Sequence, residues 1–346
     1  MPRTPHRDPR RAARRAGLRH CTDAEPGLRR LRHGQGFRYV DAEGHPVRDR
    51  TTLERIRRLA IPPAYTDVWI CADADGHIQA TGRDARGRKQ YRYHPDWHTV
   101  RGETKYHRLR VFGEALPALR RRVDEDLSRP ALTREKVVAA VVALLDASGE
   151  RIGSPAYVRT NKTFGLSTLR DRHARIEGTT LQLRFRGKHG LSREVQLRDR
   201  RLARTVQRCR DLPGQTLFQY ETADGPRPIT STDVNAYLRE VTGGDFTAKD
   251  FRTWAGTVAA ARFLAGQACE DETKMARQRY VRSLCEAVAQ QLGNTVAVCR
   301  KHYIHPAVLA AFEDGSFEKR WAKAHEGETP PELDPDEAAL VRFLGG

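Results

Sequence analysis

The chain contains 346 residues, of which 62 are Lys or Arg and 44 are Asp or Glu, so its formal net charge is +18 at pH 7. So large an excess of positive charge favours a polyanionic partner, either nucleic acid or an anionic membrane surface. The longest wholly apolar run, residues 137–145, is far shorter than a membrane span, which leaves nucleic acid as the expected partner. The length allows two domains, each with its own core.

The first 20 residues form an arginine-rich segment. They contain seven arginines and one acidic residue, and no apolar stretch follows that would make them a secretory signal. An arginine-rich start that is poor in acids also fits an organelle transit peptide, but this one offers no apolar helix face. We therefore expect residues 1–20 to be a disordered basic arm that attracts phosphates without regard to base sequence.

Residues 21–105 are expected to form a small β-rich domain. Residues 36–47 alternate between apolar and polar side chains, and residues 67–84 are typical of a hairpin that turns at Asp75-Gly76. A short helix is predicted over residues 51–59, because Pro62 and Pro63 follow it closely.

The end of this domain, GRKQYRYHPDWH at residues 87–98, mixes cationic and aromatic side chains. Two interpretations remain open at this point. Basic residues that contact phosphates, beside planar residues that face bases or sugars, suit a nucleic-acid surface. A half-buried edge strand with its tyrosines inward and its arginines outward would show the same pattern. The residues concerned are Arg88, Lys89, Tyr91, Arg92, Tyr93 and Trp97.

From residue 106 to about 325 the pattern becomes mainly helical. A helix is predicted over residues 112–126, and a second one begins after the N-cap candidate Thr133 and ends near Gly149. Aliphatic side chains surround nearly the whole second helix, so we expect it at the centre of a larger core. Further helices are predicted over residues 233–242 and 248–267.

A β-hairpin interrupts this helical region. Apolar and polar residues alternate from 181 to 186 and again around 195–197, and Gly187-Lys188-His189-Gly190 connects the two strands. Lys188 is therefore expected at the hairpin tip. A lone lysine in such a place is also typical of simple solvation.

A tyrosine inside a cationic cluster lies near the end of the chain. The helix that precedes it should end at Gly293, and Asn294, Arg300, Lys301, His302, Tyr303 and His305 follow within a short span. Neighbouring positive charge favours the phenolate of Tyr303 and also attracts a phosphate. The alternative is a buried tyrosine beside a basic surface patch. Residues 326–346 begin with a stretch rich in acids and prolines and are expected to form a solvated acidic tail.

Five residues from separate regions have the chemistry that a phosphodiester requires. Guanidinium groups and an amide suit the charge on non-bridging oxygens, and a lysine among other cations can give a proton to a departing alkoxide. Composition alone does not establish that the five converge. The residues are Arg151, Lys188, Arg252, Asn294 and Tyr303.

Four blocks of the sequence resemble the type IB DNA topoisomerases of the small bacterial and poxvirus-like kind. They read RIGSPAYVRTNKTFGLSTLRDRH, LRFRGKHG, KDFRTWAG and LGNTVAVCRKHYIHP, and the resemblance extends over about residues 30–313. It implies that Arg151 and Arg252 are the catalytic arginines and that Lys188 is the general acid. Asn294 would then bind the phosphate, and Tyr303 would be the nucleophile. One departure is Val296, where proline is commoner.

The same resemblance implies contacts with DNA. Tyr91, Tyr93, Tyr157 and Lys249 match positions that contact DNA in such enzymes, and Arg88, Lys89 and Gln90 of the first domain join them as candidates. The expected fold is α+β, with a β-rich N-terminal domain and a larger, mainly helical catalytic domain that form a C-shaped clamp on duplex DNA.

The implied activity is relaxation of supercoiled DNA through a transient single-strand break and a 3′-phosphotyrosyl intermediate, without ATP, metal or another cofactor. No acidic cluster suggests a metal site, and the six scattered cysteines, without a C-x-x-C pair, indicate reduced thiols. We expect a monomer in the bacterial cytoplasm, at the nucleoid. Two alternatives remain, a tyrosine recombinase with the same chemistry and a nonenzymatic DNA-packaging protein that binds through charge alone.

Overall fold

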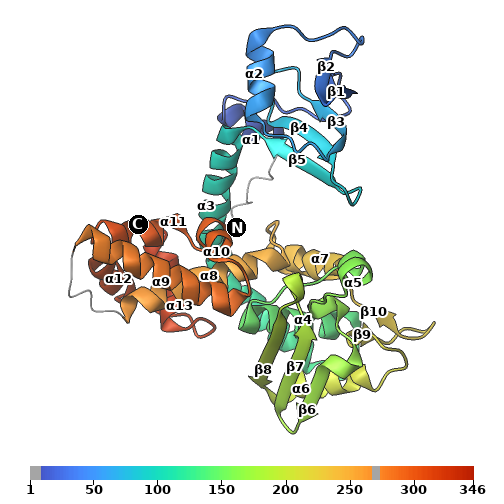
Figure 1. The fold of residues 1–346 in the computed structure, drawn as a ribbon. Helices are drawn as coiled ribbons and strands as arrows, with labels where there is room; N and C mark the ends of the chain where they lie inside the picture. The colour runs from blue at the N-terminus through green and yellow to red at the C-terminus, as the bar shows by residue number, and fades with distance from the viewer. Residues whose placement is uncertain (1–8, 267–272) are drawn as a thin grey trace. The chain divides into compact units, whose positions relative to one another are not determined.

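The computed structural model describes residues 9–266 and 273–346. It confirms the expected mixture of helices with an N-terminal sheet (Figure 1). The chain divides into two compact units between Lys105 and Tyr106, and each is described by itself below. None of the helices in the described ranges is both long enough and apolar enough to cross a bilayer.

The N-terminal unit is built on one antiparallel sheet with the strand order β2-β1-β3-β4-β5. The predicted hairpin at Asp75-Gly76 is confirmed, because it joins β3 to β4. The predicted short helix, α2, begins at the N-cap Asp49 and buries Ile56 against apolar residues of the sheet. The elements are α1 (Pro9–Arg15), β1 (Leu28–His33), β2 (Gly36–Val40), α2 (Arg50–Arg58), β3 (Thr66–Ile70), β4 (Ile78–Arg83) and β5 (Lys89–Tyr93).

The prediction of a disordered arm is wrong for residues 9–20, and its first eight residues lie outside the described ranges. Residues 9–15 form α1, and Ala13 and Leu18 are buried in a small cluster with Trp97. Arg19 then forms ion pairs with Glu25 and Asp73. The many arginines concealed these few apolar side chains, which are enough to fix the segment on the unit.

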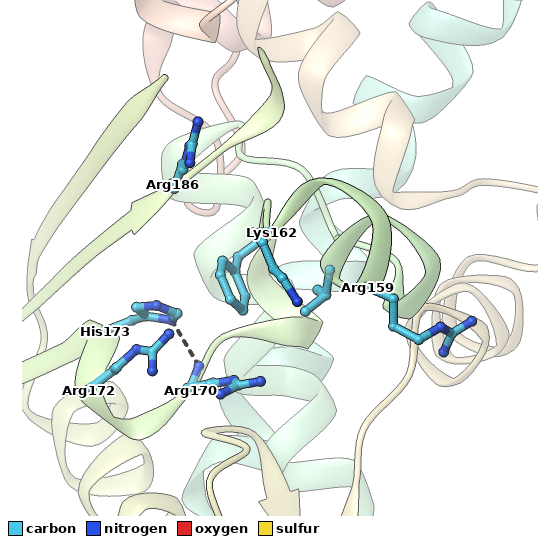
Figure 2. Close-up of a pocket in the computed structure, with 8 residues that line it drawn as sticks. Arg159, Lys162, Arg170, Arg172, His173 and Arg186 are labelled. Carbon is cyan, nitrogen blue, oxygen red and sulfur yellow. Dashed lines mark hydrogen bonds between the residues drawn. The ribbon is translucent and has the colours of Figure 1, made fainter. Parts of the chain in front are cut away.

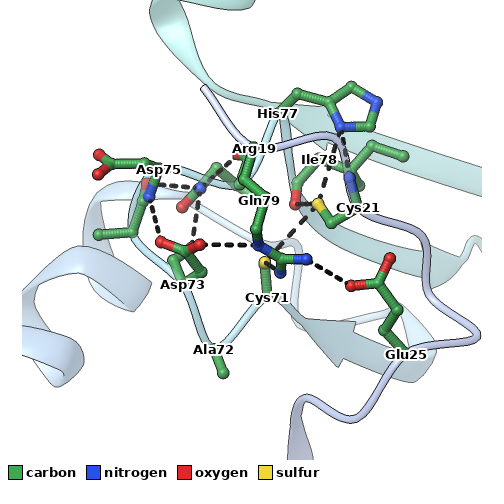
Figure 3. A network of polar contacts seen from close by, with 12 residues as sticks. Arg19, Cys21, Glu25, Cys71, Ala72, Asp73, Asp75, His77, Ile78 and Gln79 are labelled. Carbon is green, nitrogen blue, oxygen red and sulfur yellow. Dashed lines mark hydrogen bonds and ion pairs between the residues drawn. The ribbon is translucent and has the colours of Figure 1, made fainter. Parts of the chain in front are cut away.

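Two cysteines far apart in the sequence meet next to this segment (Figure 3). The Sγ atoms of Cys21 and Cys71 lie 3.7 Å apart, both thiols are buried, and the backbone N–H of Cys21 donates to Nδ1 of His77. The hydrogen bond with Cys21, together with the charge of Arg19, lowers the pKa of Cys71 to about 6. The described cysteines are free thiols, as predicted, but these two are not isolated; Cys269 lies outside the described residues.

The C-terminal unit surrounds the central helix α4. Thr133 caps its start and Gly149 ends it with a left-handed backbone (φ 60°), both as predicted. α4 is buried on nearly all sides and packs against α6, α7 and α8. The helices and strands are α3 (Pro95–Ser128, which crosses the division), α4 (Arg134–Ser148), α5 (Pro155–Asn161), β6 (Ala174–Glu177), β7 (Thr180–Arg186), β8 (Ser192–Arg198), α6 (Arg200–Arg210), β9 (Gln219–Tyr220), β10 (Arg227–Pro228), α7 (Ser231–Thr242), α8 (Ala248–Ala265), α9 (Lys274–Leu292), α10 (Val296–His302), α11 (Pro306–Glu313), α12 (Phe317–His325) and α13 (Pro335–Phe343).

The prediction of a solvated acidic tail after residue 325 is wrong for residues 333–343, although residues 326–329 are exposed. Residues 335–343 form α13, whose Leu340 and Phe343 belong to the main core. Glu337 is also buried there, where it pairs with Arg120 and accepts a hydrogen bond from the indole of Trp254 at 2.9 Å. Two of the acids that suggested solvation have these roles: Asp334 caps α13, and Glu337 pairs with Arg120.

We predict that replacing Arg120 with methionine lowers the free energy of unfolding by about 3–5 kcal/mol, because it leaves the buried Glu337 and the partly buried Asp146 without their partner. Arg120 is shared by Asp146 and Glu337. The matched control is Arg121→Met, which removes an ion pair of the more exposed Arg121 and should cost less than about 1 kcal/mol. Urea denaturation measures both variants, and equal stabilities would show that α13 is not anchored in this way.

Candidate active site

Arg151 and Asn294 come together because each follows the end of a helix. Gly149 ends α4, and Gly293 ends α9 with a left-handed backbone (φ 59°). Nη2 of Arg151 donates to Oδ1 of Asn294 and to the carbonyl of Gly293, the latter at 3.3 Å. Burial, with a contribution from the nearby charge of Arg252, lowers the pKa of Arg151 to about 10. This pair therefore forms a partly desolvated cationic and amide surface.

Arg252 lies in the first turns of α8 and is only 2% exposed. Its guanidinium donates to the carbonyl of Gly149 and, at 2.7 Å, to the carbonyl of Leu292. Those carbonyls belong to the C-terminal ends of α4 and α9, where helix backbone acceptors lack intrahelical partners and the dipole favours a cation. Arg252 thus joins the two helix ends from which Arg151 and Asn294 extend.

Tyr303 lies directly against this arginine. It is the C-cap of α10, and the guanidinium carbon of Arg252 is 5.1 Å from the centre of its ring. Thr257 holds its backbone, because Oγ1 of Thr257 donates to the Tyr303 carbonyl at 3.3 Å. Gly256 allows this approach, since a Cβ at that position would lie 2.6 Å from the same carbonyl oxygen. Contacts to both the ring and the backbone of Tyr303 therefore hold its phenol against the Arg252 guanidinium.

The amide of Asn294 retains an unused donor. Its Nδ2 atom is buried and has no hydrogen-bond partner in the described part of the chain. The neighbouring thiol of Cys299 is only a weak acceptor. A buried donor without a partner is costly, and a phosphate oxygen would satisfy it.

Lys188 stands apart from these four residues. The predicted hairpin is confirmed, with β7 and β8 antiparallel and a tight turn from Gly187 to Gly190 between them. Lys188 is exposed in this turn, and within the described ranges no hydrogen bond or ion pair joins it to the other four residues. The structure therefore brings together Arg151, Arg252, Asn294 and Tyr303, and it leaves Lys188 exposed without a bond to any of them.

The DNA-contact candidates of the C-terminal unit are exposed. Tyr157 on the short helix α5 is 54% exposed, and Lys249 lies exposed in the first turn of α8, three residues before Arg252. His305, one of the histidines near Tyr303, serves the structure instead, because its ring caps the start of α11.

The candidates of the N-terminal unit lie on or beside β5, which is an edge strand. Tyr91 and Tyr93 share one face of this strand with their rings 5.9 Å apart, and Tyr91 is 44% exposed. The interpretation with inward tyrosines is therefore wrong for Tyr91.

The polar candidates beside these tyrosines contact acids of their own unit. Arg88 pairs with Asp84 at 2.8 Å, and Gln90 donates to the same carboxylate. Lys89 pairs with Asp23 at 2.5 Å. A DNA phosphate would have to compete with these two carboxylates.

A cationic hollow of about 480 Å³ lies beside α5 (Figure 2). Arg159, Lys162, Arg172 and Arg186 border it without an ion pair to any acid of the described chain. Burial and the neighbouring arginines lower the pKa of His173, whose Nδ1 accepts from the backbone of Arg170. Sequence reasoning missed the hollow, because its lining extends from Val158 to Arg186 and only the fold gathers it. The lining residues are Val158, Arg159, Lys162, Phe164, Arg170, Arg172, His173 and Arg186.

Comparisons with known proteins give a consistent result. Residues 94–328 match the family model of the eukaryotic DNA topoisomerase I catalytic core, and residues 36–84 match that of the bacterial DNA topoisomerase IB N-terminal domain. The DNA topoisomerase 1B of Acanthamoeba polyphaga mimivirus is 29% identical over 295 residues, which cover 83% of this chain and 88% of the viral one. The DNA topoisomerase 1B of vaccinia virus (strain Copenhagen) is 20% identical over 279 residues, 78% of this chain and 84% of its own.

Proposed function

The chain belongs to the type IB DNA topoisomerase family, and on this premise we propose that Tyr303 is the nucleophile that cuts one strand of duplex DNA. The protein is thus an isomerase that acts on DNA and relaxes supercoils through a transient break. The observation that carries the assignment is the contact of the Tyr303 ring with the buried Arg252. A fixed cation beside the phenol attracts the phosphate that the Tyr303 oxygen attacks.

In the proposed mechanism the Tyr303 oxygen attacks a backbone phosphorus, and the bond to the 5′ oxygen of the next nucleotide breaks. The products are a 3′-phosphotyrosyl linkage and a 5′ hydroxyl. Arg151, Arg252 and the unused Nδ2 of Asn294 bind the non-bridging oxygens, on which charge develops in the transition state. Religation is the reverse attack, and the energy of the broken bond is kept in the linkage.

Lys188 is the proposed general acid. Its hairpin tip is exposed and its amine pairs with no acid among the described residues, so it can reach the departing oxygen once DNA is bound. Arg151, whose lowered pKa is about 10, is the second candidate for this proton.

Relaxation of supercoiled plasmid in EDTA without ATP tests the proposed function. We expect both positive and negative supercoils to relax, because the proposed groups are cations and an amide of the protein itself. An absolute requirement for Mg²⁺ or ATP would contradict the mechanism. A packaging protein would constrain supercoils without a covalent adduct, and a recombinase would exchange strands between two duplexes.

We further propose that the enzyme acts as a monomeric, C-shaped clamp on duplex DNA at the bacterial nucleoid. The proposal draws on the net charge of +18 and on the exposed tyrosines that each unit carries, Tyr91 in one and Tyr157 in the other. Light scattering of the complex with a duplex of defined length would contradict a monomer if it gave two chains per duplex.

The cationic hollow beside α5 is expected to supply phosphate contacts. Replacing Lys162 and Arg172 with glutamine should lower the slope of log affinity against log salt by roughly 1 to 2, since each phosphate contact contributes about 0.9. Fluorescence anisotropy of a labelled duplex at several salt concentrations measures this slope. The control is Arg175→Gln with Arg227→Gln, which removes the same charge from exposed arginines that pair with acids. An equal change in both double variants would show that the hollow has no special role.

A further inference from the structure

Glu150 and Arg193 form a buried ion pair to which the proposed chemistry gives no role. Their side chains are 2% and 15% exposed, and the closest N–O distance is 2.5 Å. Glu150 directly precedes Arg151, and Arg193 is the second residue of β8, next to the hairpin turn that carries Lys188. Burying two charges has a desolvation cost that such a pair recovers only with good geometry, so it is weak evidence for stability alone.

Arg193 contacts two segments besides Glu150. Its Nη2 donates to the carbonyl of Gln291 at 2.8 Å, near the end of α9. A Cβ on Gly293 would lie 2.9 Å from its Nη1, and a Cβ on Gly187 would lie 2.8 Å from its Cγ. The two glycines thus allow the arginine to pack directly against the backbone on both sides.

Through these contacts, Arg193 touches the residues that directly precede three of the proposed functional residues. Gly187 precedes Lys188, Gly293 precedes Asn294, and Glu150 precedes Arg151. The carboxylate also acts on the last of these, because its charge opposes the lowering of the Arg151 pKa. One guanidinium therefore connects the Lys188 hairpin to the two loops that hold the phosphate-binding groups.

The hairpin tip needs such a connection. Lys188 is exposed, and its turn contains His189 and Gly190 with left-handed backbones (φ 62° and 78°). A flexible lysine on this turn would sample many positions relative to the phosphate. Misplacement of a catalytic group by about 1 Å can cost on the order of 10²-fold in rate.

We propose that Arg193, held by Glu150, is a positioning residue that keeps the Lys188 hairpin in place relative to Arg151 and Asn294. The inference rests on the proposed function, since it gives Arg193 a kinetic effect through the proton that Lys188 delivers. Neither residue touches the DNA or the reacting atoms in this scheme.

The test compares cleavage of ordinary DNA with cleavage of DNA that carries sulfur at the bridging leaving position. Arg193→Met keeps the methylenes beside Gly187 and removes every donor. We expect it to cleave ordinary DNA about 10- to 100-fold more slowly, with duplex affinity unchanged. Sulfur should recover much of this loss, because a thiolate leaves without a proton. Arg193→Lys should be intermediate, because it keeps a charge but not the fork of donors.

Combination with Lys188→Ala gives a second readout. If Arg193 acts through Lys188, the double variant should cleave ordinary DNA about as slowly as Lys188→Ala alone, because the effects of two residues that act through the same step do not add. Additive losses, or an equal slowing of both substrates by Arg193→Met, would overturn the proposal. If sulfur rescues Lys188→Ala but not Arg193→Met, only the assignment of Arg193 fails. If sulfur rescues neither variant, Lys188 is not the general acid, and the proposal for Arg193 is wrong as well.

Two further variants separate positioning from folding. The double variant Arg193→Met with Glu150→Gln removes both charges of the pair and avoids an unpaired carboxylate. Its melting temperature should therefore be closer to that of the parent than the melting temperature of Arg193→Met is, while the kinetic defect remains. If its rate returns to that of the parent, the defect came from the stranded charge and the proposal is wrong. Arg184→Met on the same hairpin breaks an exposed ion pair with Glu194 and should leave the rate unchanged.

Discussion

Tyr303→Phe is expected to abolish plasmid relaxation and the covalent protein–DNA adduct while duplex affinity stays close to that of the parent. The variant removes one oxygen and keeps the ring on which Arg252 packs, so the cationic site should remain assembled. Loss of a nucleophile from an assembled site typically lowers the rate by several orders of magnitude, on the order of 10⁶ in the best-measured case. Denaturing gels of a labelled duplex measure the adduct, and anisotropy measures the affinity.

The control for this experiment is a second tyrosine of the same unit. Tyr280 on α9 packs against Phe312 and takes no part in the proposed chemistry, so Tyr280→Phe should retain both the adduct and relaxation. An adduct that survives in Tyr303→Phe would place the nucleophile elsewhere. Loss of DNA binding in that variant would instead show that the phenol hydroxyl holds the site together.

The helix ends of the catalytic unit could be predicted because local rules determine them. Thr133, Gly149 and Gly293 are cap residues whose preference depends on their own backbone, and each ends or starts a helix where expected. Two of these caps bring Arg151 and Asn294 to helix ends. That the ends meet at Arg252 depends on tertiary packing, for which the sequence pattern contained no signal.

The two ends of the chain were predicted wrongly for one physical reason. Composition measures how many charges a segment carries but not where their partners lie. Arg19 pairs with Asp73, which is more than fifty residues away in the sequence, and Glu337 pairs with Arg120, which is more than two hundred residues away. Glu150 and Arg193 were missed in the same way, because nothing in either neighbourhood indicates the other. Burial of a few apolar residues, such as Leu18 and Leu340, then decides that the segments are ordered.

Lys188→Ala is expected to cleave ordinary DNA about 10² to 10⁴ times more slowly than the parent, which is the typical cost of losing a general acid. The physical cause is the leaving group, because an alkoxide departs poorly without a proton. A thiolate departs well, since thiol pKa values lie near 8.5 and far below that of an alcohol. With sulfur at the bridging leaving position, the same variant should therefore cleave nearly as fast as the parent.

Arg252→Ala is the comparison variant for this experiment, because sulfur should rescue it much less than it rescues Lys188→Ala. Arg252 is buried against Tyr303, and its proposed targets are the non-bridging oxygens, so a better leaving group should restore little of its activity. Single-turnover cleavage of the two substrates by both variants measures the difference. Should sulfur fail to rescue Lys188→Ala, the lysine would act by stabilising charge or by positioning. The proton would then have to come from Arg151, the partly buried cation whose pKa is lowered to about 10, or from a bound water.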